Sequence, residues 1–257
     1  MALSAQEWDA RQLYQLTAVL ASGMILALAV DDYQTFISYG PGGLPHNVIG
    51  WIGARVLALV SREQLSPSIY DNKSLPYADE PGCLLPGFPP RRTPPRPQLG
   101  KHVVPQRQLQ QLPGADIKAK FIERYSQLGE QAQAKGLVEL RKSVLEREHT
   151  AFFVSPAVKG NTIVEDTKGE FSHVHTGIDA TCHVILHPSD CKAVLEAGWG
   201  QRHGLAGVTL LKKIAGVSLP VTYILIYAPR TEAEVEVVLT IVEASISFMT
   251  RTRQELE

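Results

Sequence analysis

The 257-residue chain has few cysteines and almost no net charge, and each shortage excludes a class of protein. Its three cysteines, Cys83, Cys182 and Cys191, form no CxxC motif and cannot all pair within one chain. This argues against a disulfide-stapled secreted scaffold and favours a reducing, intracellular environment. The formal net charge of −1 gives no reason to expect a nucleic-acid partner, and the sequence shows no internal repeat.

An uncharged apolar run occupies residues 16–30, after Arg11 and before the pair Asp31 and Asp32. A helix needs about 20 mostly apolar residues to span a bilayer, so this run is at the short end of the range. A membrane anchor, a buried or interfacial helix and a cleaved signal peptide are all compatible with it. A cleavable signal would need a more basic start and small residues at its cleavage site, whereas acidic residues follow this run. We therefore predict an N-terminal membrane anchor.

Two further segments separate this anchor from the C-terminal half. Residues 47–61 have apolar side chains at helical spacing around a single charge, Arg55, which predicts an amphipathic helix packed on the protein. A membrane-contacting helix is the alternative, although Arg55 would be costly in lipid. Residues 81–113 hold nine of the seventeen prolines and no acidic residue, so we expect an extended segment. It is either a linker that wraps the domain or a basic strip that touches anionic lipid.

The remainder of the chain predicts an α+β fold. Apolar runs and period-two alternation predict strands at residues 138–141, 151–154, 170–175, 181–187 and 221–227. Helices are expected to begin at the capping residues Asp116, Ser189 and Thr231, the last forming a capping box with Glu234. Runs of strands without strict βαβ alternation indicate a mixed or antiparallel sheet packed with helices, preceded by the N-terminal membrane-anchor helix. The predicted domains are the anchor at 1–32, a helical and proline-rich wrapping segment at 33–115, and a catalytic domain at 116–257.

Residues 171–207 gather most of the groups that can do chemistry. This stretch contains five of the eight histidines, namely His173, His175, His183, His187 and His203. Residues two apart on a strand share a face, so His173 and His175 point the same way. If the strands at 170–175 and 181–187 pair antiparallel, the face that carries His183 can converge on them.

Three explanations of these histidines remain open from the residues alone. A metal site would use the HxH pair and a third histidine, although no matching carboxylate or CxxC is evident. An acid–base site would use one histidine, with an ordinary pKa of about 6.5, as the proton acceptor. The plain explanation is hydrogen-bonded histidines on a half-buried sheet, and it suits His187 beside Pro188 best. Arg202 and His203, in a glycine-bounded turn, can hold an enolate or carboxylate oxygen.

Three blocks of sequence carry a resemblance to a known family. DDYQTFISYGP, EAGWGQRHGLAG and YAPRTEAEVEVVLTIVEASISFMT occur in that order. Together with VPQRQLQQL and SHVHTGIDATCHVILHP, they resemble the fungal luciferases, the enzymes that oxidise 3-hydroxyhispidin. The resemblance runs from residue 31 to residue 250 and is weak across residues 71–100 and 126–154. It implies a cofactor-independent oxygenase in which O₂ adds to an α-pyrone, CO₂ leaves and the excited product emits light.

The resemblance also implies roles for particular residues. The protein must deprotonate the enolic pyrone, stabilise the anion and exclude water. One of the strand histidines is then the base, the Arg202–His203 corner holds the oxyanion, aromatic residues wall the flat ring, and an arginine adds a polar contact. The candidate catalytic residues are His173, His175, His183, Arg202 and His203, and the candidate substrate-binding residues are Trp199, Tyr227 and Arg230.

The partners implied are the pyrone, O₂ and membrane lipid at the N-terminus. We expect no metal or organic cofactor, with a metal held by His173, His175 and His183 as the alternative. The expected location is an intracellular membrane, the endoplasmic reticulum, with a single-pass N-terminal anchor. Two other functions stay open: a non-luminous homologue that acts on another polyketide or phenolic metabolite, and a metabolite-binding module without turnover.

Overall fold

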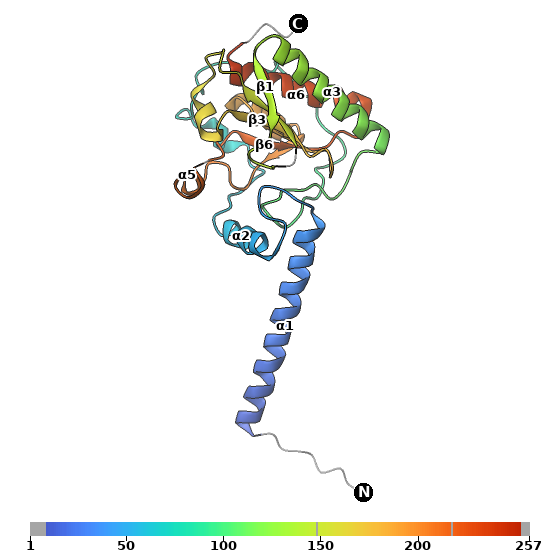
Figure 1. The fold of residues 1–257 in the computed structure, drawn as a ribbon, viewed down its shortest axis with the longest axis vertical. Helices are drawn as coiled ribbons and strands as arrows, with labels where there is room; N and C mark the ends of the chain where they lie inside the picture. Colours follow the sequence, from blue (N-terminus) through green and yellow to red (C-terminus); the bar gives the residue numbers. More distant parts are fainter. Residues whose placement is uncertain (1–8, 148, 217, 253–257) are drawn as a thin grey trace.

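A computed structural model describes residues 9–147, 149–216 and 218–252 and has the predicted α+β architecture (Figure 1). A long N-terminal helix leads into a body built on one six-stranded sheet. Every strand pairing is antiparallel, and the strand order is β1-β2-β3-β4-β6-β5. The strands are β1 (Val138–Lys142), β2 (Thr150–Val154), β3 (Glu170–Val174), β4 (Cys182–Ile185), β5 (Gly200–Arg202) and β6 (Tyr223–Ile226).

The other regular elements of the described chain are helices. They are α1 (Ala10–Ser38), α2 (Val48–Ala58), α3 (Ala115–Ala134), α4 (Pro188–Glu196), α5 (Leu210–Ala215) and α6 (Glu232–Thr250), with 3₁₀ turns η1 (Ser68–Asp71) and η2 (Thr162–Thr167). Five of the six strands match predicted segments. The short β5 lies in a stretch predicted as a loop, because three residues are too few to show alternation.

The helix caps confirm one prediction and correct two. Thr231 caps α6 and accepts a hydrogen bond from the Glu234 amide at 3.2 Å, although Glu234 turns its carboxylate to the Arg230 amide and leaves the capping box half formed. The predicted cap Asp116 is wrong, because the N-cap of α3 is Gly114, two residues earlier, which makes no side-chain bond. Ser189 is also wrong as a cap, because His187 accepts from the Ser189 amide at 3.2 Å instead.

Helix α1 extends away from the body (Figure 1). Its 29 residues measure about 43 Å at about 1.5 Å per residue. Within Ala10–Ser38 only Phe36 is buried, whereas large apolar side chains from Leu13 to Val30 are exposed. A stretch of 18 residues within it has a mean hydropathy of 1.9, so the helix is long and apolar enough to cross a membrane, which fits an anchor or a signal sequence. The predicted domain boundary at residue 32 falls inside this helix.

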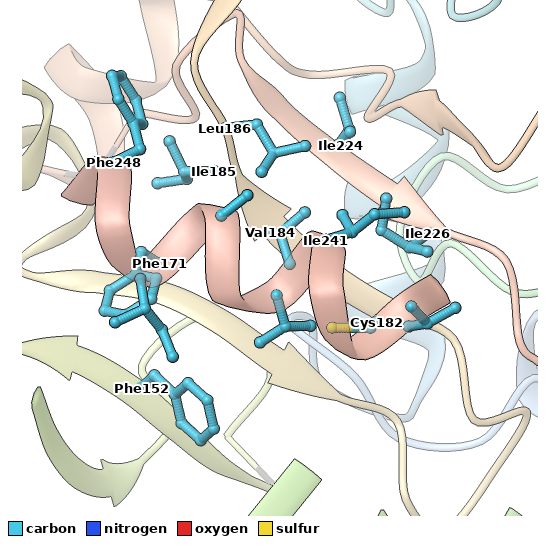
Figure 2. Packing of buried hydrophobic residues seen from close by; sticks show 14 of the residues in the cluster. Phe152, Phe171, Cys182, Val184, Ile185, Leu186, Ile224, Ile226, Ile241 and Phe248 are labelled. Atoms are coloured by element: carbon cyan, nitrogen blue, oxygen red, sulfur yellow. The ribbon is translucent and has the colours of Figure 1, made fainter. Parts of the chain in front are cut away.

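One face of the sheet forms the apolar core. Directly paired residues point to the same side of an antiparallel sheet, so Phe152, Val184 and Ile224 share this face. Helices α3 and α6 lie side by side over it (Figure 1), and Figure 2 shows Val184 and Ile226 beside Ile241 of α6. Each such side chain stabilises the fold by about 1.5–3 kcal/mol when fully buried.

The opposite face of the sheet is polar and lies under the proline-rich segment. The Gln108 amide donates to the Asp179 carboxylate at 2.7 Å, and the Gln108 side-chain oxygen accepts from the Ala228 amide at 3.0 Å. This segment is extended, as predicted, with one isolated bridge between Leu99 and Gln108 among its described residues. Arg107 is 1% exposed, so its charge is turned inward and does not contribute to a basic surface strip.

Candidate active site

Three histidines converge on the polar face of the sheet. His173 on β3 is the direct antiparallel partner of His183 on β4, and His175 follows His173 two residues later on the same side. The ring centres are 5.2 Å apart for His173–His183, 5.4 Å for His173–His175 and 5.1 Å for His175–His183. All three side chains are buried, and one nitrogen of each lies within 4.8 Å of the other two. The predicted convergence of the two strand faces is therefore observed.

A β-bulge adds a carboxylate to this cluster. In the pairing of β2 with β3, Phe152 opposes Ser172 and Phe153 opposes Glu170, so Phe171 is an extra residue without a direct partner. In a regular strand, residues three apart point to opposite faces. The extra residue shifts this alternation, so Glu170 reaches the same face as His173. The Glu170 Oε1 atom lies 2.8 Å from His173 Nδ1.

The Glu170 carboxylate is held as an anion. Burial raises its pKa, but hydrogen bonds from His173, from the Ser143 hydroxyl at 2.7 Å and from the Val144 amide at 2.7 Å outweigh burial and bring the pKa below its ordinary value. An ionised carboxylate can only accept, so His173 Nδ1 carries the proton that lies between the two groups. The Nε2 atom of His173 is buried without a hydrogen-bond partner among the described residues. Neutral His173 therefore has a free lone pair at Nε2.

A hydrogen-bond acceptor also fixes the position of the proton on His175, as Glu170 does for His173. The Thr181 hydroxyl donates to the Asp179 carboxylate at 2.8 Å and therefore accepts from His175 Nδ1 at 2.8 Å. The Arg107 Nη1 atom lies 3.3 Å from both ring nitrogens of His175. Burial, and then the Arg107 charge, lower the pKa of His175 well below its ordinary value. His175 is thus a neutral imidazole beside a buried guanidinium.

A pocket adjoins this cluster and contains about 180 Å³ of free space. His183 lines it and stacks on Tyr223, with ring centres 4.9 Å apart and planes 11° apart. His203 lines it as well and accepts a hydrogen bond at Nδ1 from the Leu205 amide at 3.1 Å, which leaves the proton of the neutral ring on Nε2. Burial lowers the pKa of His203 to about 3, and burial lowers that of His183 well below its ordinary value. The other lining residues are Gly43, Leu44, Leu57, Val104, Leu145, Glu146, Leu205 and Leu219.

Arg202 lies apart from these histidines. It pairs with Ile224 on the core face of the sheet, whereas its neighbour Gln201 pairs with Leu225 on the histidine face. Its Nη2 atom donates to the backbone oxygen of Glu63 and lies 3.4 Å from the carboxylate of that residue. The structure therefore does not bring the predicted Arg202–His203 corner together.

The predicted substrate-binding residues lie around a different arginine. The Trp199 indole donates to the Pro90 oxygen at 2.6 Å, and the Tyr227 hydroxyl donates to Gln201 at 2.9 Å. Arg92 stands 5.8 Å from the Trp199 ring centre and 5.5 Å from that of Tyr227. Arg230 forms an ion pair with Glu234 within α6 and the loop before it. None of the described residues Arg202, Trp199, Tyr227 and Arg230 lines the pocket beside the histidines.

Four residues of the site were absent from the sequence-based set: Glu170, Arg107, Glu146 and Tyr223. Arg107 and Glu146 form a buried ion pair at 3.1 Å, and Glu146 Oε1 lies 3.8 Å from His175 Nε2. The sequence offered a signal for Tyr223, which alternates with Leu225 in a predicted strand. Arg107 stands in the block VPQRQLQQL, where nothing about spacing pointed to the histidines. The three histidines could hold a metal ion, but any such ion would lie close to the Arg107 charge.

Comparisons with known proteins match both this region and the whole chain. Residues 168–245, which include β3 to β6, match the family model described as a luciferase domain. A luciferase of Armillaria ostoyae is 39% identical over 245 residues, which cover 90% of this chain and 85% of that protein. A luciferase of Armillaria mellea is 40% identical over 233 residues, which cover 85% of this chain and 80% of that protein. A luciferase of Neonothopanus nambi is 37% identical over 241 residues, which cover 90% of this chain and 85% of that protein. No solved structure matches the chain.

Proposed function

Because the chain belongs to the fungal luciferase family, we propose that it is a membrane-anchored luciferase that oxidises 3-hydroxyhispidin or a similar α-pyrone with O₂. In this reaction O₂ adds to the pyrone ring, one carbon leaves as CO₂, and the excited product relaxes with emission of light. The observation that carries the proposal is a pocket lined by His183 and His203 beside a buried cluster of three histidines. The chemistry makes the protein an oxygenase.

Deprotonation of the pyrone is the step for which the histidines are suited. Ground-state O₂ is a triplet and reacts slowly with closed-shell molecules, but an electron-rich enolate can donate one electron to it. His183 lines the pocket, and its ring centre lies 5.2 Å from that of His173, whose Nε2 lone pair has no partner among the described residues. We assign the enol proton to this pair, with Glu170 stabilising the imidazolium that forms on His173.

Anion stabilisation has two sources in this site. His203 stays neutral because its pKa is lowered to about 3, and it can donate from Nε2 to the enolate oxygen. Arg107 supplies a fixed positive charge behind His175, partly balanced by Glu146. Both groups are buried, so their interactions with the anion are less screened than they would be in water.

We propose that this chemistry needs no resident metal or organic cofactor. The support for a metal-free cluster is Arg107, whose Nη1 lies 3.3 Å from the His175 ring. Two positive unit charges about 5 Å apart repel by roughly 3 kcal/mol at an effective dielectric constant of about 20, and a divalent ion doubles that. Taken alone, the Arg107 charge opposes a metal cation on the His175 side of the cluster, against the opposite effect of the Glu146, Asp179 and Glu170 carboxylates.

We also propose that α1 crosses an intracellular membrane once, in the endoplasmic reticulum. The support is its exposed apolar surface from Leu13 to Val30 and its length. The polar end of the helix, from Asp31 onward, contacts the body through ion pairs of Lys101 with Asp31 and Asp32.

The test measures O₂ consumption and photon emission together, with purified full-length protein in detergent and 3-hydroxyhispidin as substrate. Light with stoichiometric loss of O₂ supports the proposal. O₂ consumption without light would indicate a non-luminous homologue, and binding of the pyrone without turnover would indicate a metabolite-binding module. Either of these outcomes overturns the proposed luciferase activity.

A further inference from the structure

Helix α2 exposes an apolar face that no described part of the chain covers. Ile49, Ile52, Val56 and Leu59 are 74%, 52%, 58% and 85% exposed. Their spacing of three or four residues puts them on one side of the helix. Apolar patches of this kind on a soluble body are associated with a partner or a membrane.

The opposite side of α2 fixes the direction of this face. Gly50 and Ala54 are its buried residues, one turn apart. A Cβ atom at Gly50 would lie 1.7 Å from the oxygen of Pro45, so the turn that leads into α2 folds back onto this side of the helix as closely as glycine allows. This side of α2 is therefore occupied by its own N-terminal turn, and the isoleucines lie on the other side.

Helix α2 is attached at the point where the apolar surface of α1 ends. The Trp51 indole donates to the Asp32 carboxylate at 2.7 Å, and the ring centres of Trp51 and Tyr33 are 5.8 Å apart. Arg55, which is exposed, lies 3.7 Å from Asp32 as well. Figure 1 shows α2 at the base of the body, beside the end of α1. The last exposed apolar residue of α1, Val30, precedes Asp32 by two positions.

We propose that α2 lies in the plane of the membrane–water interface, with its Ile49–Leu59 face in lipid. This inference rests on the proposed membrane crossing by α1. With 11 residues, or about 16 Å, α2 is too short to span a bilayer, but it suits an interfacial amphipathic helix. A lipid surface is the occupant that fits, because it already surrounds the adjoining apolar surface of α1. Trp51 and Arg55 are residue types that membrane interfaces favour.

The contact of α2 with the membrane also brings lipid close to the candidate active site. Leu57 of α2 and Leu44, just before it, line the pocket together with His183 and His203. A flat, weakly polar pyrone concentrates in the interfacial layer of a bilayer. It therefore reaches the pocket past α2 without crossing bulk water, and α2 has the role of a docking element for substrate delivery.

A spin-label measurement tests the position of α2. The full chain carries Cys83→Ser to remove the partly exposed thiol, and Ile49→Cys provides the labelling site in phosphatidylcholine–phosphatidylserine vesicles. Gln127→Cys, on the exposed side of α3 in the same background, is the matched control. We expect the label at position 49 to collide more with O₂, which concentrates in lipid, than with a water-soluble nickel chelate. The label at position 127 should show the reverse order.

The outcomes separate this inference from the proposed anchor. A chain that does not float with the vesicles overturns the membrane crossing by α1. A vesicle-bound chain whose label at 49 meets the nickel chelate as often as the label at 127 overturns the interfacial position of α2. A label at 49 shielded from both collision partners indicates a protein partner, such as a second copy, and also overturns it.

An activity measurement tests substrate delivery. The double variant Ile49→Glu/Ile52→Glu should raise KM for pyrone presented in vesicles by roughly tenfold, the effect of about 1.4 kcal/mol, and leave kcat and KM in detergent unchanged. Leu85→Glu, at a residue that is 77% exposed outside α2, is the control and should change neither. An unchanged KM in vesicles would overturn delivery past α2. Loss of light from the unmodified chain in both media would instead refute the luciferase activity.

Discussion

Replacement of Glu170 by glutamine tests the proton acceptor directly. The carboxylate accepts from the Val144 and Leu145 amides at Oε2, and from His173 and the Ser143 hydroxyl at Oε1. Backbone amides cannot change from donors to acceptors, so the glutamine oxygen must take the Oε2 position. The glutamine NH₂ group then faces His173 and donates to Nδ1, which moves the histidine proton to Nε2.

The magnitude follows from this change of tautomer. A histidine with its proton on Nε2 has no lone pair for the enol proton, and loss of a general base or its orienting carboxylate costs about 10²–10⁴ in rate. We therefore expect Glu170→Gln to lower kcat for light emission by at least about 100-fold, with little change in KM. The variant replaces hydrogen bonds to a charged carboxylate with bonds to a neutral amide. Loss of one such charge-assisted bond lowers the free energy of unfolding by about 1.5–3 kcal/mol, so the fold should persist at low temperature.

The assay measures kcat and KM for photon emission, with the ¹⁵N chemical shifts of His173 as a readout of its tautomer. Glu139→Gln, on a partly exposed carboxylate of β1, is the matched control and should change none of these quantities. If folded Glu170→Gln protein keeps kcat within about threefold, the Glu170–His173 pair is not the proton acceptor. A tautomer shift without loss of kcat would show that the Nε2 lone pair of His173 is not needed to accept the enol proton.

Four further predictions concern protonation, anion binding and metal. Burial lowers the pKa of His175, His183 and His203, the last to about 3, so below about pH 6.5 the unfolded chain binds protons that the folded chain does not. The free energy of unfolding should be at its full value above about pH 7 and fall by up to roughly 4 kcal/mol per pH unit as the pH drops below 6. Chemical denaturation in detergent at a series of pH values measures it. A profile that does not change with pH would contradict the conclusion that these three histidines are buried in the neutral form. His203→Ala should lower kcat by about 10²–10³ through loss of an oxyanion donor, and an unchanged kcat would remove His203 from that role. Arg202→Lys should lower the melting temperature and leave kcat nearly unchanged, because Arg202 contacts Glu63 and not the pocket. A loss of kcat as large as that of His203→Ala would instead show that Arg202 helps to hold the oxyanion. Dialysis against a chelator should leave light emission unchanged, and elemental analysis that finds one tightly held zinc or iron per chain would overturn the metal-free cluster.

Local periodicity was enough to predict the fold class and the histidine cluster. His173, His175 and His183 follow strand alternation and lie on consecutive strands, so antiparallel pairing alone brings them together. Glu170 could not be found in this way, because the bulge at Phe171 reverses the alternation and depends on pairing with β2.

Other residues were misplaced or missed for reasons of the same kind. Arg202 was expected in a loop, but it ends the short strand β5, where alternation turns its side chain away from Gln201 and the histidine face. Arg107 reaches His175 across 68 residues of sequence from a segment without periodicity. Only tertiary structure brings two such residues together.

The proline-rich cover also has a consequence for the order of events during synthesis. Gln108 leaves the ribosome 120 residues before its hydrogen-bond partner Ala228. At about 5–20 residues per second, that interval is roughly 6–24 s. During this time the amphiphilic N-terminal part can already be in contact with the membrane, while the sheet that its following segment must cover does not yet exist. The proline-rich segment can therefore make its contact with Ala228 over the histidine face only after β6 has been synthesised.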